Sequence, residues 1–468
     1  MGMEIGKSRG LFWRGAPKDM QNVEGAYRTE GLILDLTMSA EKHVDAKIFE
    51  QFSNLRLLEI IGAHDIKGNL KDLFHELRVI RWHGCSWTYL PPSFRPQNLV
   101  SLDMSMSNLE KFWKSPTVTP LKQLANLTHM NLAGCVNLKQ LPEQLGDIKG
   151  LKMIDASFSA IEELPDSITH LKKLVKLNLY GCKKLRVLPK QFGNIEGLRT
   201  FDATDSAIRQ LPDSFVDLIN LVDLQLSYCK RLRKLPEQFG NMVGLRTFDA
   251  GESAIEQLPE SFGCLKNLDY LRNVSPTRHL SLSKLHNLQY LTLANCTSLG
   301  SSFPELPLNL MLLNICGHTA LEQLPDMSYL KELIILNIHR CNNLQSLPTL
   351  PPHLKLIEVS KCKRLEELPD LSMLKELESL SFSNCSNLKV IDLKGTSLIM
   401  NNTTPFHLRL FYQTASLQNV YAPEPVTLGV LYSLSSFKRS EAMRLEKCIN
   451  LQLLRLQQPS RCIRAVHD

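Results

Sequence analysis

The chain has 468 residues, of which 43% are hydrophobic and 22% are charged, so a folded protein is expected and a disordered one is excluded. The formal net charge is +7, but acidic and basic residues are interleaved along the chain, which disfavours binding to nucleic acid. No run of about 18 uninterrupted apolar residues occurs, so neither a transmembrane helix nor a membrane partner is expected. Residues 1–14 lack the apolar segment of a signal peptide, and the expected compartment is the cytoplasm or the nucleus.

Three regions follow one another along the chain. Residues 1–29 contain no repeat and are expected to form an irregular link. Residues 30–393 carry a sequence repeat, which an Asn-Val-Ser-Pro sequence at 273–276 interrupts and thereby predicts a bend or a loop. From 394 to 468 the period fades, so we expect a degenerate C-terminal repeat or cap that is partly loop. One degenerate repeat is predicted at residues 445–451.

The repeat has the form L-x-L-x-x-C, in which two leucines alternate with variable residues and a cysteine follows. Residues 177–182 and 224–229 show this form, and serine takes the place of the cysteine in alternate repeats. The interval from Cys135 to Ser159 is 24 residues, and that from Ser159 to Cys182 is 23. Both the form and the period match the leucine-rich-repeat signature, whose period is about 20–29 residues.

A second period of 47 residues lies over the first. It recurs in two interleaved series, the cysteines Cys135, Cys182 and Cys229 and the serines Ser159, Ser206 and Ser253. We infer that this part of the array grew by duplication of a pair of repeats.

Within each repeat, the alternation predicts a short β-strand whose leucines point inward and whose intervening side chains face outward. The segment after the strand, such as residues 165–171, begins with a proline and returns the chain. One repeat cannot bury its leucine face alone, so stacked repeats must share a core. The expected fold class is α/β: a leucine-rich-repeat solenoid, or horseshoe, with a parallel β-sheet on the concave face and short helical or irregular convex segments.

Most of the twelve cysteines occupy the ninth position of the repeat signature. A small side chain there turns inward beneath the bend of the chain and can bond to unpaired backbone groups. We therefore interpret these cysteines as structural thiols in one ladder. No C-x-x-C pair supports a zinc site, and disulfides are not expected in a reducing compartment.

The candidate partner-binding residues are the outward side chains on the predicted concave face. Acidic and amide side chains recur between the inward positions, with two more acids beside them: Asp155, Asn178, Asp202, Gln225 and Asp249, then Asp205 and Glu252. Aromatic side chains, which often anchor interfaces, lie on the same face: Phe158, Tyr180, Tyr228, Tyr270 and Tyr290. The acids would suit a basic partner surface. Two alternatives stay open, namely that the acids are merely solvated and that the aromatic rings only pack between strands.

No catalytic motif is apparent. The repeated acids have no partner base, and neither an H-E-x-x-H metal motif nor a G-x-S-x-G nucleophile elbow occurs. Residues 6–8 (Gly-Lys-Ser) echo a phosphate-binding loop, but Met1 stands where that motif requires glycine. We therefore expect a non-catalytic chain with no catalytic residue, no cofactor and no metal. The basic clusters at 183–186 and 230–234 are interpreted as a solvated rim that offsets the acids or touches another domain.

Segments near the start resemble the first repeats of a known family. They include Thr-Glu-Gly-Leu-Ile-Leu-Asp-Leu at 29–36, Leu-Arg-Val-Ile-Arg-Trp-His-Gly at 77–84, and Leu-Glu-Lys-Phe-Trp at 109–113. Their order and spacing are similar to those in the leucine-rich-repeat region of plant disease resistance proteins of the Toll/interleukin-receptor, nucleotide-binding type. The later Leu-Pro-(Glu/Asp) repeats resemble the body of that region, and the resemblance extends to about residue 393.

The resemblance implies a scaffold for protein recognition in plant immunity, through effector recognition or through autoinhibition. The implied partners are a pathogen effector, a guarded host protein, or the nucleotide-binding domain of an immune receptor. The sequence contains neither the Toll-like nor the nucleotide-binding domain, so their activities are not implied. Two other classes stay open: an extracellular receptor ectodomain, which needs a signal peptide, and a substrate receptor of a ubiquitin ligase, which needs an F-box-like helix pair.

Overall fold

The structure, a computed structural model, consists of two compact units, Met1–Leu310 (unit 1) and Met311–Asp468 (unit 2). It describes residues 4–5, 11–15, 26–37, 43–62, 65–67, 76–91, 94–113, 124–274, 282–294, 303–388, 390–392, 407–411, 419–421 and 427–430.

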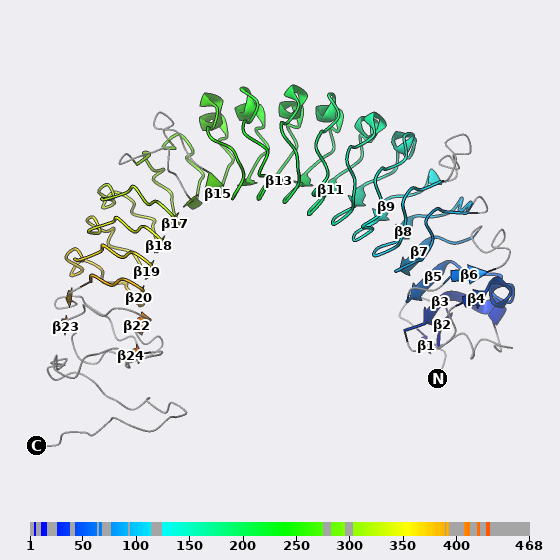
Figure 1. Ribbon diagram of the computed structural model, residues 1–468, viewed down its shortest axis with the longest axis horizontal. Coiled ribbons are helices and arrows are strands. Elements are labelled where there is room, and N and C mark those ends of the chain that lie inside the picture. Colours follow the sequence, from blue (N-terminus) through cyan, green and yellow to red (C-terminus); the bar gives the residue numbers. More distant parts are fainter. Residues whose placement is uncertain are drawn as a thin grey trace, which may run out of the picture. The chain divides into compact units, whose positions relative to one another are not determined.

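Unit 1 is built on short parallel strands that line the inner side of a curved array (Figure 1). Each strand pairs in parallel with the next, in the order β2 (Leu11–Gly15), β3 (Thr29–Asp35), β5 (Leu57–Ile61), β7 (Val79–His83), β8 (Ser101–Asp103), β9 (His129–Asn131), β10 (Met153–Asp155), β11 (Lys176–Asn178), β12 (Thr200–Asp202), β13 (Asp223–Gln225), β14 (Thr247–Asp249), β15 (Tyr270–Val274) and β16 (Tyr290–Ala294). Outside this order, β1 (Glu4–Ile5) is antiparallel to β2, and β4 (His43–Asp45) pairs in parallel with β6 (Asp65–Lys67).

Unit 2 contains a parallel array of the same kind. Its paired strands are, in order, β17 (Leu312–Cys316), β18 (Ile335–His339), β19 (Leu356–Ser360), β20 (Ser379–Ser383), β22 (His407–Phe411) and β24 (Thr427–Val430). A second parallel pair is formed by β21 (Val390–Asp392) and β23 (Asn419–Tyr421). The predicted parallel solenoid of leucine-rich repeats is thus confirmed within each unit.

Strand pairing extends beyond the predicted limits of the array. Irregular chain was the expectation for residues 1–29, but this is wrong for 11–15, which form β2 and pair with β3. Strands β22 and β24 continue the pairing after residue 393, in the region for which a degenerate repeat or cap is predicted. Backbone groups at the edge of a sheet can be paired by any extended segment, so pairing does not require the leucine pattern. The repeat predicted at 445–451 lies outside the described residues.

The interruption predicted at 273–276 begins at the end of β15. Where β15 pairs with β16, the register shifts between Arg272 and Val274. Such a shift leaves an extra residue on one strand and is the mark of a β-bulge. The break in the sequence pattern thus coincides with a shift in strand register, while the predicted bend or loop stays a prediction, because residues 275–281 lie outside the described part of the chain.

The inward side chains of the strands form the core. In β11, Leu177 is fully buried, as is Leu179 just after the strand, while Asn178 between them stays partly exposed. Phenylalanines fill the core of the middle repeats, with ring centroids 5.2 to 5.9 Å apart in the cluster Phe192, Phe201 and Phe215. The same cluster recurs 47 residues later as Phe239, Phe248 and Phe262. Duplication of a repeat pair therefore duplicated its packing.

The convex segments of the middle repeats are short 3-10 helices, whereas those at residues 317–334 and 340–355 are turns and irregular chain, so both predicted forms of the convex segment occur. Those of the middle repeats lie on the outer side of unit 1 (Figure 1) and are η5 (Leu145–Asp147), η6 (Asp166–His170), η7 (Phe192–Asn194), η8 (Asp213–Asp217), η9 (Phe239–Asn241) and η10 (Glu260–Cys264). Two others, η2 (Ala26–Arg28) and η3 (Ala46–Phe49), lie nearer the N-terminus. A proline precedes η6, η8 and η10, with φ between −66° and −68°, which suits the start of a helical turn.

Glycines allow neighbouring convex helices to touch through their backbones. A Cβ added to Gly193 in η7 would lie 1.8 Å from the carbonyl oxygen of Ser214 in η8. The Gly193 amide donates to Ser214 Oγ at 3.1 Å, so the contact is also hydrogen-bonded. The same contacts recur at Gly146 and Gly240, one repeat pair earlier and later.

We expect the substitution Gly193→Ala to lower the free energy of unfolding by about 2 kcal/mol, because the backbone of η8 must move away. Urea unfolding followed by circular dichroism measures the change. Gly150→Ala is the matched control, since a Cβ there would lie 3.4 Å from its nearest neighbour, Ala125 O. Its effect should stay within about 0.5 kcal/mol. Equal effects of the two substitutions would contradict the packing argument.

At the end of each strand the chain turns at a residue with left-handed backbone, which we call the bend residue. Its φ lies between 55° and 74° at eight successive positions of unit 1: Gly84, Met106, Gly134, Phe158, Gly181, Asp205, Tyr228 and Glu252. In every case the next residue is the cysteine or serine at the ninth position of the repeat. Glycine adopts this conformation freely, whereas any other residue meets a steric penalty of about 1–2 kcal/mol.

The cysteines that follow the bends form the predicted structural ladder. Cys135, Cys182 and Cys229 are fully buried, and each thiol donates to a backbone carbonyl of the preceding repeat at 3.1 to 3.2 Å. The serines of the alternate repeats join the ladder, as in the 3.3 Å contact from Ser159 Oγ to Cys182 Sγ. Burial raises the pKa of the Cys135 thiol to about 11, so it remains protonated near neutral pH. No disulfide links the nine cysteines within the described ranges.

Candidate functional site

The acidic and amide column of the concave face mainly serves to hold the strand ends. Asp155 and Asn178 each accept, through Oδ1, the backbone N–H two residues later, at 3.0 and 3.1 Å. Asp202 and Asp249 accept in the same way at 2.9 and 2.8 Å. These bonds replace ladder hydrogen bonds where the strand stops, as Asx turns do. These side chains therefore have a structural role, which is to satisfy backbone N–H groups at the strand ends.

Two members of the column depart from the expectation of exposed acids. Asp249 is only 6% exposed, so its predicted exposure is wrong; it accepts from Gly251 N and forms an ion pair with Arg272 at 3.6 Å. Asp202 is half-buried, and burial, with the charges of Asp223 and Asp155, raises the pKa of its carboxyl. Neighbouring repeats stack only one strand spacing apart, which shields the side chains between them.

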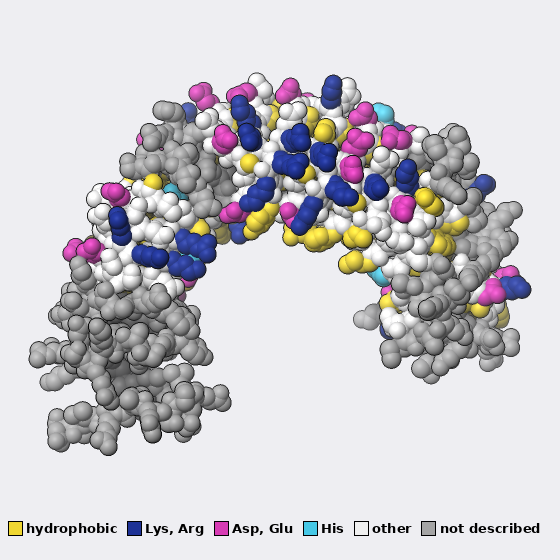
Figure 2. Space-filling view, viewed as in Figure 1, with side chains coloured by type: hydrophobic (Ala, Val, Ile, Leu, Met, Phe, Trp, Pro, Cys, Tyr) yellow, Lys and Arg dark blue, Asp and Glu magenta, His cyan; other side chains and the backbone are white. Residues whose placement is uncertain are grey.

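Large apolar side chains emerge at three of the bends. Met106, Phe158 and Tyr228 are 71%, 52% and 53% exposed. The Phe158 ring covers Gly181, the bend residue of the next repeat, and meets Tyr180 edge-on with centroids 4.9 Å apart. Figure 2 shows hydrophobic side chains gathered along the inner edge of the middle of unit 1. Met106 was not among the predicted residues, although its place one residue before Ser107 could have indicated it.

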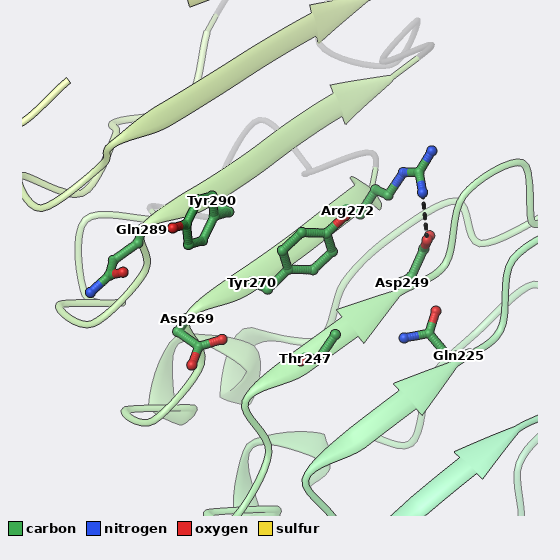
Figure 3. Close-up of a pocket in the computed structure, with 8 residues that line it drawn as sticks. All are labelled: Gln225, Thr247, Asp249, Asp269, Tyr270, Arg272, Gln289 and Tyr290. Atoms are coloured by element: carbon green, nitrogen blue, oxygen red, sulfur yellow. Dashed lines mark ion pairs between the residues drawn. The ribbon is translucent and has the colours of Figure 1, made fainter. Parts of the chain in front are cut away.

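A hollow of about 420 Å³ lies on the concave face across β13 to β16 (Figure 3). It brings together four of the predicted residues, Gln225, Asp249, Tyr270 and Tyr290. The remaining lining residues were not predicted; they are Thr247, Asp269, Arg272 and Gln289. Strand register could have indicated Arg272, because it lies beside Asp249 in the same column. Asp269 and Gln289 directly precede the two tyrosines in sequence.

The other predicted residues are distributed along the face and do not form one pocket. Asp155, Asn178, Phe158 and Tyr180 lie on the two repeats of β10 and β11, where Asn178 Nδ2 donates to Asp155 Oδ2 at 2.8 Å. Asp202 and Asp205 follow on the next repeat, and Tyr228 and Glu252 on the two after it.

Two lysines of the basic clusters lie beside bend residues, and Figure 2 shows Lys and Arg side chains concentrated on one flank of the middle of unit 1. Lys183 pairs with Asp205 at 3.2 Å, and Lys230 pairs with Glu252 at 3.1 Å. Lys230 also lies 5.4 Å from the centroid of the Tyr228 ring. Two of these lysines thus offset acids of the neighbouring repeat, which is one of the roles expected of them. Exposed pairs of this kind contribute little to stability.

The described residues contain no group of three or more His, Cys, Asp or Glu side chains that could hold a metal ion. Within the same ranges, no helix has the length and apolarity required to cross a membrane.

The stacked parallel strands, buried cysteine ladder and outward-facing concave column define the class of protein: this chain is a leucine-rich-repeat protein. No protein-family model matches it. Its sequence is similar to plant disease resistance proteins of Arabidopsis thaliana, and the predicted resemblance is confirmed. It is 32% identical to disease resistance protein RML1A over 161 residues, which make up 33% of this chain and 16% of that relative. It is 31% identical to disease resistance protein RPS6 over 165 residues, or 33% of this chain and 14% of the relative.

Solved structures show the same fold at low sequence identity. A leucine-rich-repeat protein of Leptospira interrogans aligns with 80% of this chain and 94% of its own, with a TM-score of 0.53 and 20% identity. The functional domain of InlJ from Listeria monocytogenes, described as including a cysteine ladder, aligns with 86% of this chain and 76% of its own, with a TM-score of 0.55 and 17% identity. These likenesses concern the fold alone.

Proposed function

We propose that this chain is a protein-recognition scaffold of plant immunity and that its concave face captures a pathogen effector. The similarity to disease resistance proteins supports the immune context, and the leucine-rich-repeat fold supports binding rather than catalysis. A guarded host protein, or the nucleotide-binding domain of an immune receptor, are the other partners that this context suggests.

The observation that carries the proposal is the presence of exposed aromatic residues at strained bends. Gly134 and Gly181 show that glycine fits the bend, yet Phe158 and Tyr228 hold the same left-handed backbone at φ values of 55° and 60°. Each aromatic residue costs about 1 kcal/mol there, and half of its side chain remains in water. Strain of this kind commonly marks a binding surface, and Phe and Tyr are suitable interface anchors.

We expect the double substitution of Phe158→Gly and Tyr228→Gly to abolish partner capture while the fold becomes up to about 2 kcal/mol more stable. The immobilised full chain and the double variant are exposed to extracts of healthy and pathogen-challenged plant leaves. Bound proteins are compared by quantitative mass spectrometry, and stability is measured by urea unfolding. The opposite signs of the two effects separate loss of an anchor from loss of structure.

Lys361→Gly provides the matched control, because Lys361 occupies the same bend in unit 2 with φ 57°. This single substitution should gain up to about 1 kcal/mol, half the gain of the double variant, and keep the partner. A partner found only after pathogen challenge supports effector recognition, and one found in healthy leaves supports a host protein. Equal capture by the wild-type chain and the double variant would refute the assignment of the aromatic bends.

A further inference from the structure

We propose that the hollow across β13 to β16 holds an arginine side chain of the protein partner. This inference rests on the proposed function, because the arginine belongs to the segment that the concave face captures. The hollow has about the volume of one or two side chains, and its lining combines acid, amide, hydroxyl and aromatic groups.

The charges of the lining leave one acid without a counter-charge. Asp249 and Asp269 are its two carboxylates, and Arg272 is its one cation. The Arg272 Nη1 pairs with Asp249 Oδ2 at 3.6 Å, while no ion pair joins Asp269 to any described residue. In Figure 3, Arg272 reaches toward Asp249, and Asp269 lies on the other side of the Tyr270 ring. The Asp269 end of the hollow therefore attracts a cation.

Two tyrosine rings provide a second attraction for a cation at the same end. Tyr270 and Tyr290 come from adjacent parallel strands, and their ring centroids lie 6.2 Å apart with an interplanar angle of 39°. The ring faces carry negative quadrupole potential, which binds a cation within about 6 Å of a centroid. Tyr290 is 39% exposed, so its ring is accessible to a ligand.

The acceptors favour arginine over lysine. Gln225 Nε2 donates to Asp223 Oδ1 at 2.6 Å, so one of its two amide donors is engaged, and its carbonyl oxygen can accept from a ligand. With the Asp269 carboxylate and the Gln289 carbonyl, the lining offers several separated acceptors. A planar guanidinium has five donors and stacks on an aromatic face, whereas an ammonium has three donors around one point.

The test uses four peptides of the form acetyl-Gly-Gly-X-Gly-Gly-amide, in which X is arginine, lysine, the uncharged isostere citrulline or aspartate. Binding to the full chain is measured by ligand-observed NMR titration. The arginine peptide should bind at least about tenfold more tightly than the citrulline peptide, and its affinity should fall with added salt. Asp269→Asn and Tyr290→Leu should each weaken the arginine peptide about fivefold.

Asp147→Asn is the matched control, because Asn194 and Asn241 occupy the same place in the equivalent convex helices. It should leave peptide binding unchanged. Equal binding of the arginine and citrulline peptides, or an unaltered affinity in Asp269→Asn, overturns the inference. Tighter binding of an aspartate peptide would also overturn it and would point instead to Arg272.

The two proposals fail in distinguishable ways. If the wild-type chain captures a leaf protein but the arginine peptide does not bind, the hollow is assigned wrongly and the proposed function stands. If the peptide binds in an Asp269-dependent manner but no protein is captured, the hollow is confirmed and the recognition proposal fails. The double variant at Phe158 and Tyr228 should still bind the arginine peptide, since neither residue lines the hollow.

Discussion

Replacing Phe215 by alanine is expected to lower the free energy of unfolding by about 3–5 kcal/mol, the largest effect that we expect from a single core change. Phe215 lies in η8 on the convex side and is fully buried. Its ring stacks on Phe192 with centroids 5.7 Å apart and meets Phe201, the inward residue of β12, at 5.9 Å. Removing it opens a cavity between two convex helices and the sheet, and removes a contact that joins successive repeats.

The control for Phe215 is supplied by the repeat itself. The position 47 residues earlier holds Ile168, which is also fully buried, and the position 47 residues later holds Phe262. Phe215→Leu introduces a large aliphatic side chain, as Ile168 does at the equivalent position. It should therefore lower the free energy of unfolding by less than about 1.5 kcal/mol. Phe262→Ala should lower the free energy of unfolding by about as much as Phe215→Ala, because its cluster has the same geometry.

Urea unfolding measures the stability of the three variants, and hydrogen exchange of β12 and β13 shows where the structure is destabilised. A loss below about 1 kcal/mol in Phe215→Ala would show that the cluster does not hold the repeats together.

Lowering the pH from 7.5 to 5 is expected to destabilise unit 2 by about 2 kcal/mol, because His318 binds a proton in the unfolded chain but not in the folded one. His318 takes the ladder position in its repeat and is 2% exposed, and burial lowers its pKa to about 4 from an ordinary value of 6.5. Between these two pH values the unfolded chain binds a proton that the folded chain does not. Stability is therefore fully present above about pH 6.5 and falls as the pH drops to about 4.

The substitution His318→Cys tests this expectation, because cysteine occupies the following ladder positions at Cys341, Cys362 and Cys385. The urea midpoint of unit 2 is compared at pH 5 and pH 7.5 in both proteins. His339 also has a lowered pKa, from burial and the charges of Lys361 and Arg340, so some pH dependence should remain in the variant. The difference between the proteins isolates His318, and an identical pH dependence would show that His318 does not titrate in this range.

Most of the fold could be predicted from the sequence because a leucine-rich repeat is a local pattern. The 23- and 24-residue intervals from Cys135 to Cys182 determined the strand positions, and the alternation around Asn178 determined which side chains are buried. The ladder role of Cys182 followed from its place in the same pattern. Residues 11–15 lack the repeat signature, so the pattern could not predict that β2 pairs with β3.

The candidate site was predictable only in part, because its properties arise between repeats. The period predicted that Phe158 and Tyr228 face outward, and both are about half exposed, but it could not show that their backbone is left-handed. Nor could it show that Asp249 is buried and forms an ion pair with Arg272 on the next strand.

The sequence by itself thus determined the class of fold, the inward and outward sides of each strand and the structural role of the cysteines, since each depends on one repeat and its periodic neighbours. Only the tertiary structure decided which outward residues are exposed to solvent. Exposure, bend strain and the hollow at Tyr270 and Tyr290 depend on how far apart successive repeats stack and on the side chains that each repeat presents to the next.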